Sequence, residues 1–403
     1  MKYWLLPDGI NESLPDEAES LEAMRRKLLD LYRGWGYRFV MPPLVEYLES
    51  LSIAMGSQLD LQTFKLTDQT NGRMMGVRAD ITPQVARIDS HRMSLLPGQP
   101  NRLCYIGSVL RTHSEVAGGS RSPIQVGAEL FGHAGIESDF EVISLMVETL
   151  QSAGASKIVL DLGHVGILRA LMSKVGLSAK QESVYLDQLE RKSLPEIESW
   201  LKDSNFDEVT CDMLRAVPLL HGEVNLLERE AAKKLSLGGE EVLQALDYLK
   251  LLINKLAKAY PSIAINIDLA EMRGYAYHTG IVYAAYIPEN GREVARGGRY
   301  DGIGENFGNA RPATGFSCNL RTLLALETTA AKASDSDGSI ERNGVLAPIA
   351  DDAELSALIN QLRADGEIVI RQLVATDKVA ASAQGCNRII EKKSGKWQII
   401  AAA

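Results

Sequence analysis

Two Asn-Gly dipeptides, each placed between short apolar segments, constrain the fold of this 403-residue chain more than any other local feature. Asn-Gly favours the tight turn of an antiparallel hairpin, because both residues tolerate positive φ. We therefore expect at least two antiparallel hairpins, which a purely alternating βαβ pattern does not provide. The turns are Asn71-Gly72, between 64–66 and 74–77, and Asn290-Gly291, between 281–287 and 293–295.

The segments around these hairpins predict an α+β fold, with an antiparallel sheet flanked by helices. Apolar residues recur at helical spacing from Ala18 to Leu31, and Gly34 ends that pattern. The stretch 165–256 is almost wholly helical in its pattern and is expected to be an insertion into the fold. Further helices are expected at 82–93, 139–153 and 321–330, and further strands at 37–40, 103–110, 122–131, 158–161 and 263–267.

A change of composition divides the chain near its C-terminus. Residues 328–344 are rich in Ala, Ser, Asp and Gly, which is typical of a linker. We expect one large domain over 1–327 before the linker and a small α/β domain over 345–403 after it. The small domain is expected to contain a first strand, a helix at 352–364, a second strand at 368–372 and a hairpin that turns at 393–395.

Charge and cysteine usage narrow the class of protein. The formal net charge of −9 is unfavourable for a binder of nucleic acid, which needs clustered Lys and Arg to neutralise phosphates. The chain contains neither a signal-peptide core nor an apolar run near the roughly 20 residues that span a bilayer. The four cysteines are scattered without metal-binding spacing, which favours free thiols in a reducing cytoplasm; a zinc site or disulfides remain the alternatives.

Acidic, hydroxyl, aromatic and arginine side chains occur in segments expected to be strands and turns around one sheet. A zwitterionic amino acid with an imidazole ring needs carboxylates for its ammonium group, arginine or backbone donors for its carboxylate, and an aromatic wall. Gln125 and Glu129 are four residues apart on one expected strand, so both should point to one face. Taken singly, a carboxylate on a strand is more often part of a solvated face, and a lone tyrosine is more often part of the core, than a ligand contact.

Two short stretches are similar to the histidine-recognition signatures of histidyl-tRNA synthetases. They are Arg273–Gly280, which reads Arg-Gly-Tyr-Ala-Tyr-His-Thr-Gly, and Arg296–Asp301, which reads Arg-Gly-Gly-Arg-Tyr-Asp. Residues 77–82 and 125–132 resemble two further segments of that family, in the same order along the chain. The resemblance implies a class II aminoacyl-tRNA synthetase-like fold and a histidine pocket formed by Asp80, Thr82, Arg111, Gln125, Glu129, Arg273, Tyr277 and Tyr300.

Two groups with which class II synthetases hold ATP are replaced at the matching positions. His113 stands where motif 2 has a glutamate, and Thr322 stands where motif 3 has an arginine. Arg321 comes one residue early, which on a helix turns its side chain by about 100°. Each lost charged hydrogen bond costs on the order of 1.5–3 kcal/mol of binding. We therefore expect crippled adenylation, with no catalytic residue, no cofactor and no metal.

The whole pattern resembles the regulatory subunits of ATP phosphoribosyltransferase, which are paralogues of histidyl-tRNA synthetases. The resemblance covers residues 1–327 well and the C-terminal part poorly. It implies a non-catalytic, cytoplasmic protein of histidine biosynthesis that takes L-histidine as its effector and does not act on tRNA. It also implies a homodimer core around 39–46 and a hetero-octamer with a short-form catalytic subunit, which this protein activates and makes sensitive to inhibition by histidine.

Two other functions remain open at this stage. A divergent histidyl-tRNA synthetase, or a ligase that activates histidine for another acceptor, predicts histidine-dependent pyrophosphate exchange. A structural scaffold with a vestigial pocket predicts no histidine binding at all. His113 and Thr322 argue against the enzyme, because both replace groups that bind ATP in the synthetases.

Overall fold

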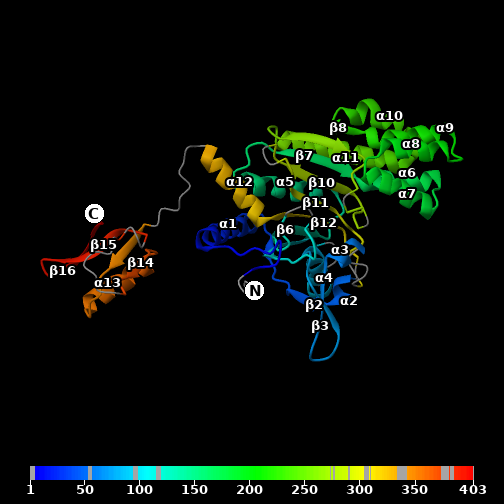
Figure 1. The fold of residues 1–403 in the computed structure, drawn as a ribbon. Coiled ribbons are helices and arrows are strands. Elements are labelled where there is room, and N and C mark those ends of the chain that lie inside the picture. The colour runs from blue at the N-terminus through cyan, green and yellow to red at the C-terminus, as the bar shows by residue number, and fades with distance from the viewer. Residues whose placement is uncertain are drawn as a thin grey trace. The chain divides into compact units, whose positions relative to one another are not determined.

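The structure is a computed structural model of the 403-residue chain, and it separates into two units, Met1–Ser334 and Asp335–Ala403. Figure 1 shows the fold of each unit. The residues that the structure describes are 5–52, 57–93, 99–114, 119–272, 274–275, 277–288, 291–303, 308, 310–333, 343–373, 381 and 385–402.

Among the described residues of the first unit, nine strands form one mixed sheet. Most neighbouring strands are antiparallel, as expected, but the β1–β5 and β7–β9 pairs are parallel. Both parallel pairs join segments that are distant in sequence, so no local turn signal announces them. In spatial order the strands are β1 (Arg38–Phe39), β5 (Asn101–Ser108), β6 (Ile124–Phe131), β12 (Ala313–Asn319), β11 (Glu293–Arg299), β10 (Ile281–Tyr286), β7 (Val159–His164), β9 (Ala264–Asp268) and β8 (His221–Glu223).

One face of this sheet is covered by long amphipathic helices. In β6, Val126, Ala128 and Leu130 join the main apolar core with these helices, and the alternate residues point to the opposite face. Helices α1 and α12 lie side by side, as Figure 1 shows, and Lys27 of α1 pairs with Glu327 of α12 at 3.1 Å. The helices on this face are α1 (Pro15–Gly34), α5 (Ile136–Ser152), α11 (Glu240–Ala259) and α12 (Leu320–Ala333).

The opposite face carries a smaller apolar cluster and the N-terminus of α4 (Thr82–Arg92). The α4 helix follows the three-stranded sheet in which β4 (Met74–Val77) pairs with both β2 (Val45–Tyr47) and β3 (Phe64–Thr67). The first expected hairpin is therefore confirmed, with Gly72 at a φ of +75°. Two short helices precede it, α2 (Leu48–Ser52) and α3 (Ser57–Gln62).

The stretch expected to be a helical insertion is mostly helical, but it also contains one short strand. Strand β8 lies within it and pairs antiparallel with β9 at the end of the main sheet. A strand of three residues shows no periodicity, which explains why the sequence pattern misses it. The remaining helices here are α6 (Val165–Val175), α7 (Ala179–Glu190), α8 (Leu194–Lys202), α9 (Glu208–Ala216) and α10 (Ala232–Lys234), with short 3₁₀ or π turns at Val217–Leu219, Leu227–Ala231 and Ser236–Gly238.

The second hairpin is confirmed by the antiparallel pairing of β10 with β11, although Asn290 of its turn lies outside the described residues. Helix α12 continues to Ala333, into the range expected as linker, and 334–342 lie outside the described residues. The expected domain limits of 1–327, 328–344 and 345–403 stay predictions.

In its described residues, the second unit is a four-stranded sheet with one helix, in the predicted order. Leu355 and Ile359 of the helix pack against Val345 and Ile390 of the sheet, in a small core of their own. Asp352 caps the helix by accepting hydrogen bonds from the backbone N–H groups of Glu354 and Leu355. The elements are β13 (Gly344–Ala347), α13 (Ala353–Ala364), β14 (Val369–Arg371), β15 (Cys386–Lys393) and β16 (Lys396–Ala401).

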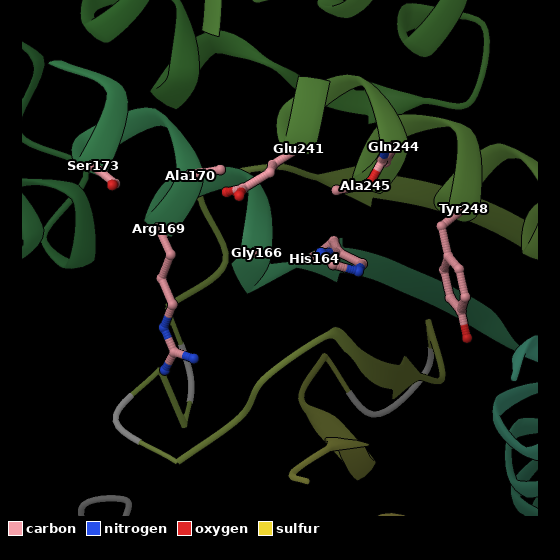
Figure 2. Close-up of a pocket in the computed structure, with 9 residues that line it drawn as sticks. All are labelled: His164, Gly166, Arg169, Ala170, Ser173, Glu241, Gln244, Ala245 and Tyr248. Carbon is pink, nitrogen blue, oxygen red and sulfur yellow. The ribbon is translucent and has the colours of Figure 1, made fainter. Parts of the chain in front are cut away.

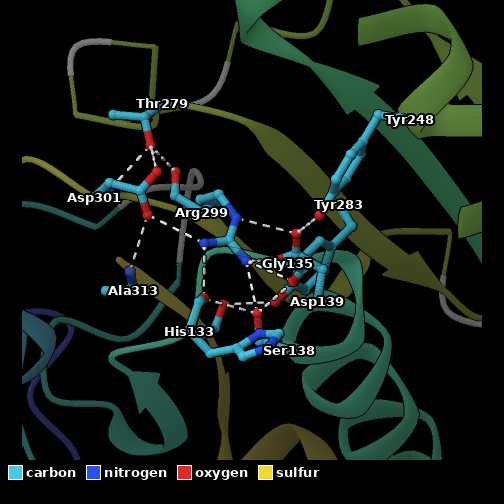
Figure 3. A network of polar contacts seen from close by, with 11 residues as sticks. His133, Gly135, Ser138, Asp139, Tyr248, Thr279, Tyr283, Arg299, Asp301 and Ala313 are labelled. Carbon is cyan, nitrogen blue, oxygen red and sulfur yellow. Dashed lines mark hydrogen bonds and ion pairs between the residues drawn. The ribbon is translucent and has the colours of Figure 1, made fainter. Parts of the chain in front are cut away.

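A buried ion pair fixes the main sheet to the helix layer. Arg299, at the end of β11, lies 3.0 Å from a carboxylate oxygen of Asp139 in the first turn of α5 (Figure 3). The same guanidinium group donates to Ser138 Oγ at 2.8 Å and to Asp301 Oδ1 at 3.1 Å. Tyr248 of α11 donates its hydroxyl to Asp139, so three elements meet at one carboxylate. Arg299 therefore belongs to the framework rather than to a ligand site.

Replacing Arg299 by methionine is expected to destabilise the fold by about 3–5 kcal/mol, because it leaves the carboxylate of Asp139 buried without a cation. Denaturant unfolding followed by circular dichroism measures the difference. The matched control is Arg296→Met on the same strand, whose side chain is 43% exposed and pairs with Glu293 at the surface. That variant should lose no more than about 1 kcal/mol. Equal losses in both variants would contradict a special role for the buried pair.

Candidate functional site

On the sheet face that carries the start of α4, glycines of neighbouring strands leave an area without side chains of their own. Glu129 of β6 lies opposite Gly315 of β12, which in turn lies opposite Gly298 of β11. A Cβ atom on Gly315 would lie 1.4 Å from Glu129 Oε2, so the carboxyl group of Glu129 lies directly over that glycine. A Cβ on Gly298 would likewise lie 2.8 Å from the imidazole Nε2 of His278. The side chains of Glu129 and His278 pack directly against Gly315 and Gly298, and we call the surface formed by these two glycines the glycine floor.

Three hydroxyl groups surround the carboxyl group of Glu129, which is 1% exposed. Thr82 and Tyr105 each donate to Oε1 at 3.0 Å, and Tyr300 donates to Oε2. The hydroxyls of Thr82 and Tyr105 also lie 3.0 Å from each other. The group therefore joins α4, β5, β6 and the residue that follows β11 at one point.

Gln125 and Asp80 extend this cluster along the same face. Gln125 donates from Nε2 to Asp80 Oδ1 at 2.9 Å, and its carbonyl oxygen accepts the backbone N–H of Ile81 at 2.9 Å. The same oxygen of Asp80 accepts the N–H of Thr82 at 2.9 Å. The prediction that Gln125 and Glu129 share a face is confirmed, since both contact the segment that opens α4. Five predicted site residues, Asp80, Thr82, Gln125, Glu129 and Tyr300, thus lie together.

Burial dominates the electrostatics of the cluster. It raises the pKa of Glu129 from 4.5 to about 8, because the three hydroxyl donors only partly offset the loss of water, and nearby Asp80 adds repulsion. Burial and the Glu129 charge also hold the pKa values of Tyr105 and Tyr300 well above their ordinary value. The carboxyl group is therefore mostly protonated at pH 7 when the site is empty, and a cation placed beside it would favour its ionised form.

The other predicted residues lie at the margin of the cluster or outside the described part. Arg111 donates from Nε to the backbone oxygen of Ala79 at 3.2 Å, next to the Asp80 segment. Tyr277 is 45% exposed, and its ring lies 4.2 Å from that of His278, measured between centroids. Arg273 lies outside the described residues, so its expected role stays a prediction.

Two residues that the sequence reasoning did not assign to the site lie inside it. Tyr105 contacts both Thr82 and Glu129, and its ring lies within 2.4 Å of where a Cβ on Gly127 would be. His278 is 6% exposed and covers Gly298, whereas its neighbour Tyr277 is largely exposed. The sequence alone gave no signal for Tyr105, because its place beside Gly127, between Gln125 and Glu129, depends on the register of β5 and β6.

His113, at one position expected to have lost an ATP contact, and Arg321, beside the other, contact residues of the protein itself. Arg321 pairs with Glu17 of α1, on the helix side of the sheet. The ring Nδ1 of His113 lies 3.1 Å from the hydroxyl of Thr112, which in turn donates to the backbone oxygen of Leu61. Within the described ranges, no group of three or more His, Cys, Asp or Glu side chains has the arrangement of a metal site, and all four cysteines are free thiols.

Comparison with known proteins gives the same fold and family over the full length. The profile of histidyl-tRNA synthetases matches residues 9–323, and that of the ATP phosphoribosyltransferase subunit HisZ C-terminal domain matches residues 342–400. The ATP phosphoribosyltransferase regulatory subunit of Thioalkalivibrio sulfidiphilus is 50% identical over 397 residues, which cover 98% of each chain. The regulatory subunit of Alkalilimnicola ehrlichii is 50% identical over 393 residues, which cover 97% of this chain and 95% of the relative.

Solved structures support the fold independently. The crystal structure described as an ATP phosphoribosyltransferase regulatory subunit/histidyl-tRNA synthetase from Bacillus halodurans superposes with a TM-score of 0.80 at 25% identity, over 96% of this chain and 97% of that chain. A chain of the ATP phosphoribosyl transferase (HisG:HisZ) complex from Thermotoga maritima gives a TM-score of 0.57 at 18% identity, over 74% and 96%. The second likeness concerns the fold alone. The expected class II synthetase-like fold is confirmed. In the described part of the chain, no helix combines the length and apolarity that a bilayer span requires.

The raised pKa of Glu129 predicts how stability depends on pH. Because the folded chain prefers the protonated carboxyl, it holds more protons than the unfolded chain between about pH 4.5 and about 8. The free energy of unfolding should therefore fall as pH rises through this window, by up to about 1.4 kcal/mol per pH unit from this group. Glu129→Gln should flatten that slope in denaturant unfolding measured at successive pH values. Parallel slopes in the two proteins would contradict the assignment.

Proposed function

The chain belongs to the family of ATP phosphoribosyltransferase regulatory subunits, and on this premise we propose that it is the histidine sensor of that enzyme. It binds L-histidine on the glycine floor and makes the catalytic subunit sensitive to the end product of its pathway. It also activates that subunit when histidine is scarce.

The cluster around Glu129 is the observation that carries the proposal. Two carboxyl groups, Glu129 and Asp80, lie with Thr82 and Gln125 on one sheet face, and such groups suit an α-ammonium group or an imidazole N–H. Tyr300 and His278 supply ring surfaces beside the same floor. Arg111 and Arg273 are proposed to meet the ligand carboxylate, and Tyr277 to close over the ring.

The same geometry disfavours an aminoacylating enzyme. Arg321 is occupied by Glu17, and Thr322 and His113 stand where synthetases hold ATP. A pocket with contacts for an amino acid but not for a nucleotide suits a protein that binds its ligand without reacting it. Adenylation requires both substrates to be held side by side in a fixed geometry. We therefore propose that the chain acts on neither ATP nor tRNA.

The partner is proposed to be the short-form catalytic subunit, which condenses ATP with phosphoribosyl pyrophosphate in the cytoplasm. The proposed assembly is a hetero-octamer with four copies of each subunit, built on homodimers of this chain around residues 39–46. Histidine can shift such an assembly only by binding one of its states more tightly than another. The loop that carries Tyr277 and His278 is the proposed moving element, because it connects the pocket with exposed surface.

Glu129→Ala is expected to weaken inhibition of the assembled enzyme by histidine about 10- to 100-fold, because a charged hydrogen bond contributes roughly 1.5–3 kcal/mol. Activation of the catalytic subunit should remain. The measurement is the histidine concentration that halves phosphoribosyl transfer, in the complex with wild-type or variant chain. Glu137→Ala, at an exposed residue of α5, is the matched control. Loss of activation together with inhibition would assign Glu129 a folding role instead.

Calorimetric titration of the full chain with L-histidine separates the sensor from the enzyme and from the scaffold. We expect saturable histidine binding that needs no ATP, no heat on adding ATP alone, and no histidine-dependent pyrophosphate exchange. Pyrophosphate exchange would restore the synthetase or ligase as the function. Absence of histidine binding, both in the free chain and in the complex, would leave a scaffold.

A further inference from the structure

A second hollow lies on the helix side of the sheet, away from the glycine floor. Its volume is about 490 Å³, which is within the range of small-molecule sites. Helices α6 and α11 form its walls, and Figure 2 shows the side chains that line it. Gly166, Ala170 and Ala245 leave space between the helices, while His164, Arg169, Glu241 and Gln244 bring polar groups to its rim.

The rim carries two opposite charges that do not satisfy each other. Glu241, in the first turn of α11, forms no ion pair among the residues that the structure describes. Arg169 of α6 donates from Nη2 to the backbone oxygen of Tyr275 at 2.6 Å, and within the described part of the chain its other donors have no hydrogen-bond acceptor, so they are available to a ligand. A ligand that carries both an ammonium and a carboxylate group would match this pair.

His164 adds a neutral ring to the lining of the same hollow. It is the residue before α6, and its ring lies in the hollow, edge-on to Tyr248 with centroids 5.8 Å apart (Figure 2). Its Nδ1 is enclosed and has no hydrogen-bond partner among the described residues. Burial, reinforced by the charge of Arg299, lowers the pKa of His164 to about 4, so the ring is neutral at pH 7. A neutral imidazole can exchange a hydrogen bond with a ligand ammonium or carboxylate group.

We propose that this hollow is a second small-molecule site, distinct from the glycine floor, and that it takes a free amino acid in its zwitterionic form. The carboxylate pairs with Arg169 and the ammonium group with Glu241. The aliphatic part of the ligand lies against Ala170 and Ala245, and His164 and Tyr248 close the far end.

The site is placed to influence the loop of the first histidine signature. Arg169 holds Tyr275 twice, through the backbone oxygen and by lying 5.0 Å from the centre of its ring. Val165, the first residue of α6, donates its N–H to the backbone oxygen of Gly280 at 3.0 Å, at the other end of that loop. A ligand that binds Arg169 therefore affects the contacts of Arg169 with Tyr275, in the segment whose residues Tyr277 and His278 border the glycine floor. Any coupling between the two sites must be reciprocal.

Nuclear magnetic resonance of the full chain with ¹⁵N-labelled histidine tests the proposal. The chain has six histidines, and His164→Gln identifies the ring signals of His164 by their loss. Each proteinogenic amino acid except histidine is added at millimolar concentration, beside acetate, methylammonium and inorganic phosphate. We expect at least one amino acid to shift the His164 signals saturably, and the three ions, each of one charge sign, to leave them in place.

Variants distinguish binding of an amino acid in this hollow from a non-specific effect of the amino acid on the whole protein. Glu241→Gln and Arg169→Met should each weaken the amino-acid response by about tenfold or more. Lys174→Met, on the same helix but outside the lining, should leave it unchanged. Glu241 does not contact the Tyr275 loop in any hydrogen bond or ion pair of the described residues, so its variant excludes an indirect effect through that loop. No response to any amino acid, an equal response to acetate or phosphate, or a response unchanged in both variants would overturn the proposal.

Discussion

The buried pair of Arg299 and Asp139 is the interaction on which the rest of the first unit depends. Asp139 is fully buried in the first turn of α5, and a carboxylate there is tolerated only with a cation beside it. The arginine comes from the end of β11, and the next residue, Tyr300, turns to the opposite face and meets Glu129. One strand end thus fixes the helix layer on one side and the site on the other, and the position of Tyr300 follows from that of Arg299.

Much of this arrangement could be predicted from the sequence wherever the cause is local. Asn71-Gly72 specifies a hairpin by its own backbone preference, and the spacing of Gln125 and Glu129 specifies a shared face by the two-residue repeat of a strand. The parallel β1–β5 and β7–β9 pairs could not be predicted, because their partners are distant in sequence and are chosen by packing. The structural role of Arg299 could not be predicted for a different reason. It lies inside a glycine motif that resembles a ligand-binding turn, although its side chain points to the helices.

The residues of the proposed amino-acid site and those at the expected nucleotide positions differ in their structural setting. The contacts of Glu129 lie on the rigid centre of the sheet, where four neighbouring elements determine each side chain. The expected nucleotide positions lie elsewhere. His113 is in a loop, where its ring contacts the hydroxyl of Thr112, and Thr322 is in the first turn of α12, next to Arg321, which pairs with Glu17. Substitutions at such margins leave the contacts around Glu129 undisturbed.

The raised pKa of Glu129 makes the proton a competitor of any cationic effector. A ligand ammonium group is held best by the ionised carboxylate, so below about pH 8 binding must first expel a proton, and the ligand concentration needed rises toward tenfold per unit of acidification. In the histidine sensor proposed above, occupancy of the site would therefore depend on the concentration of hydrogen ions as well as on that of the effector.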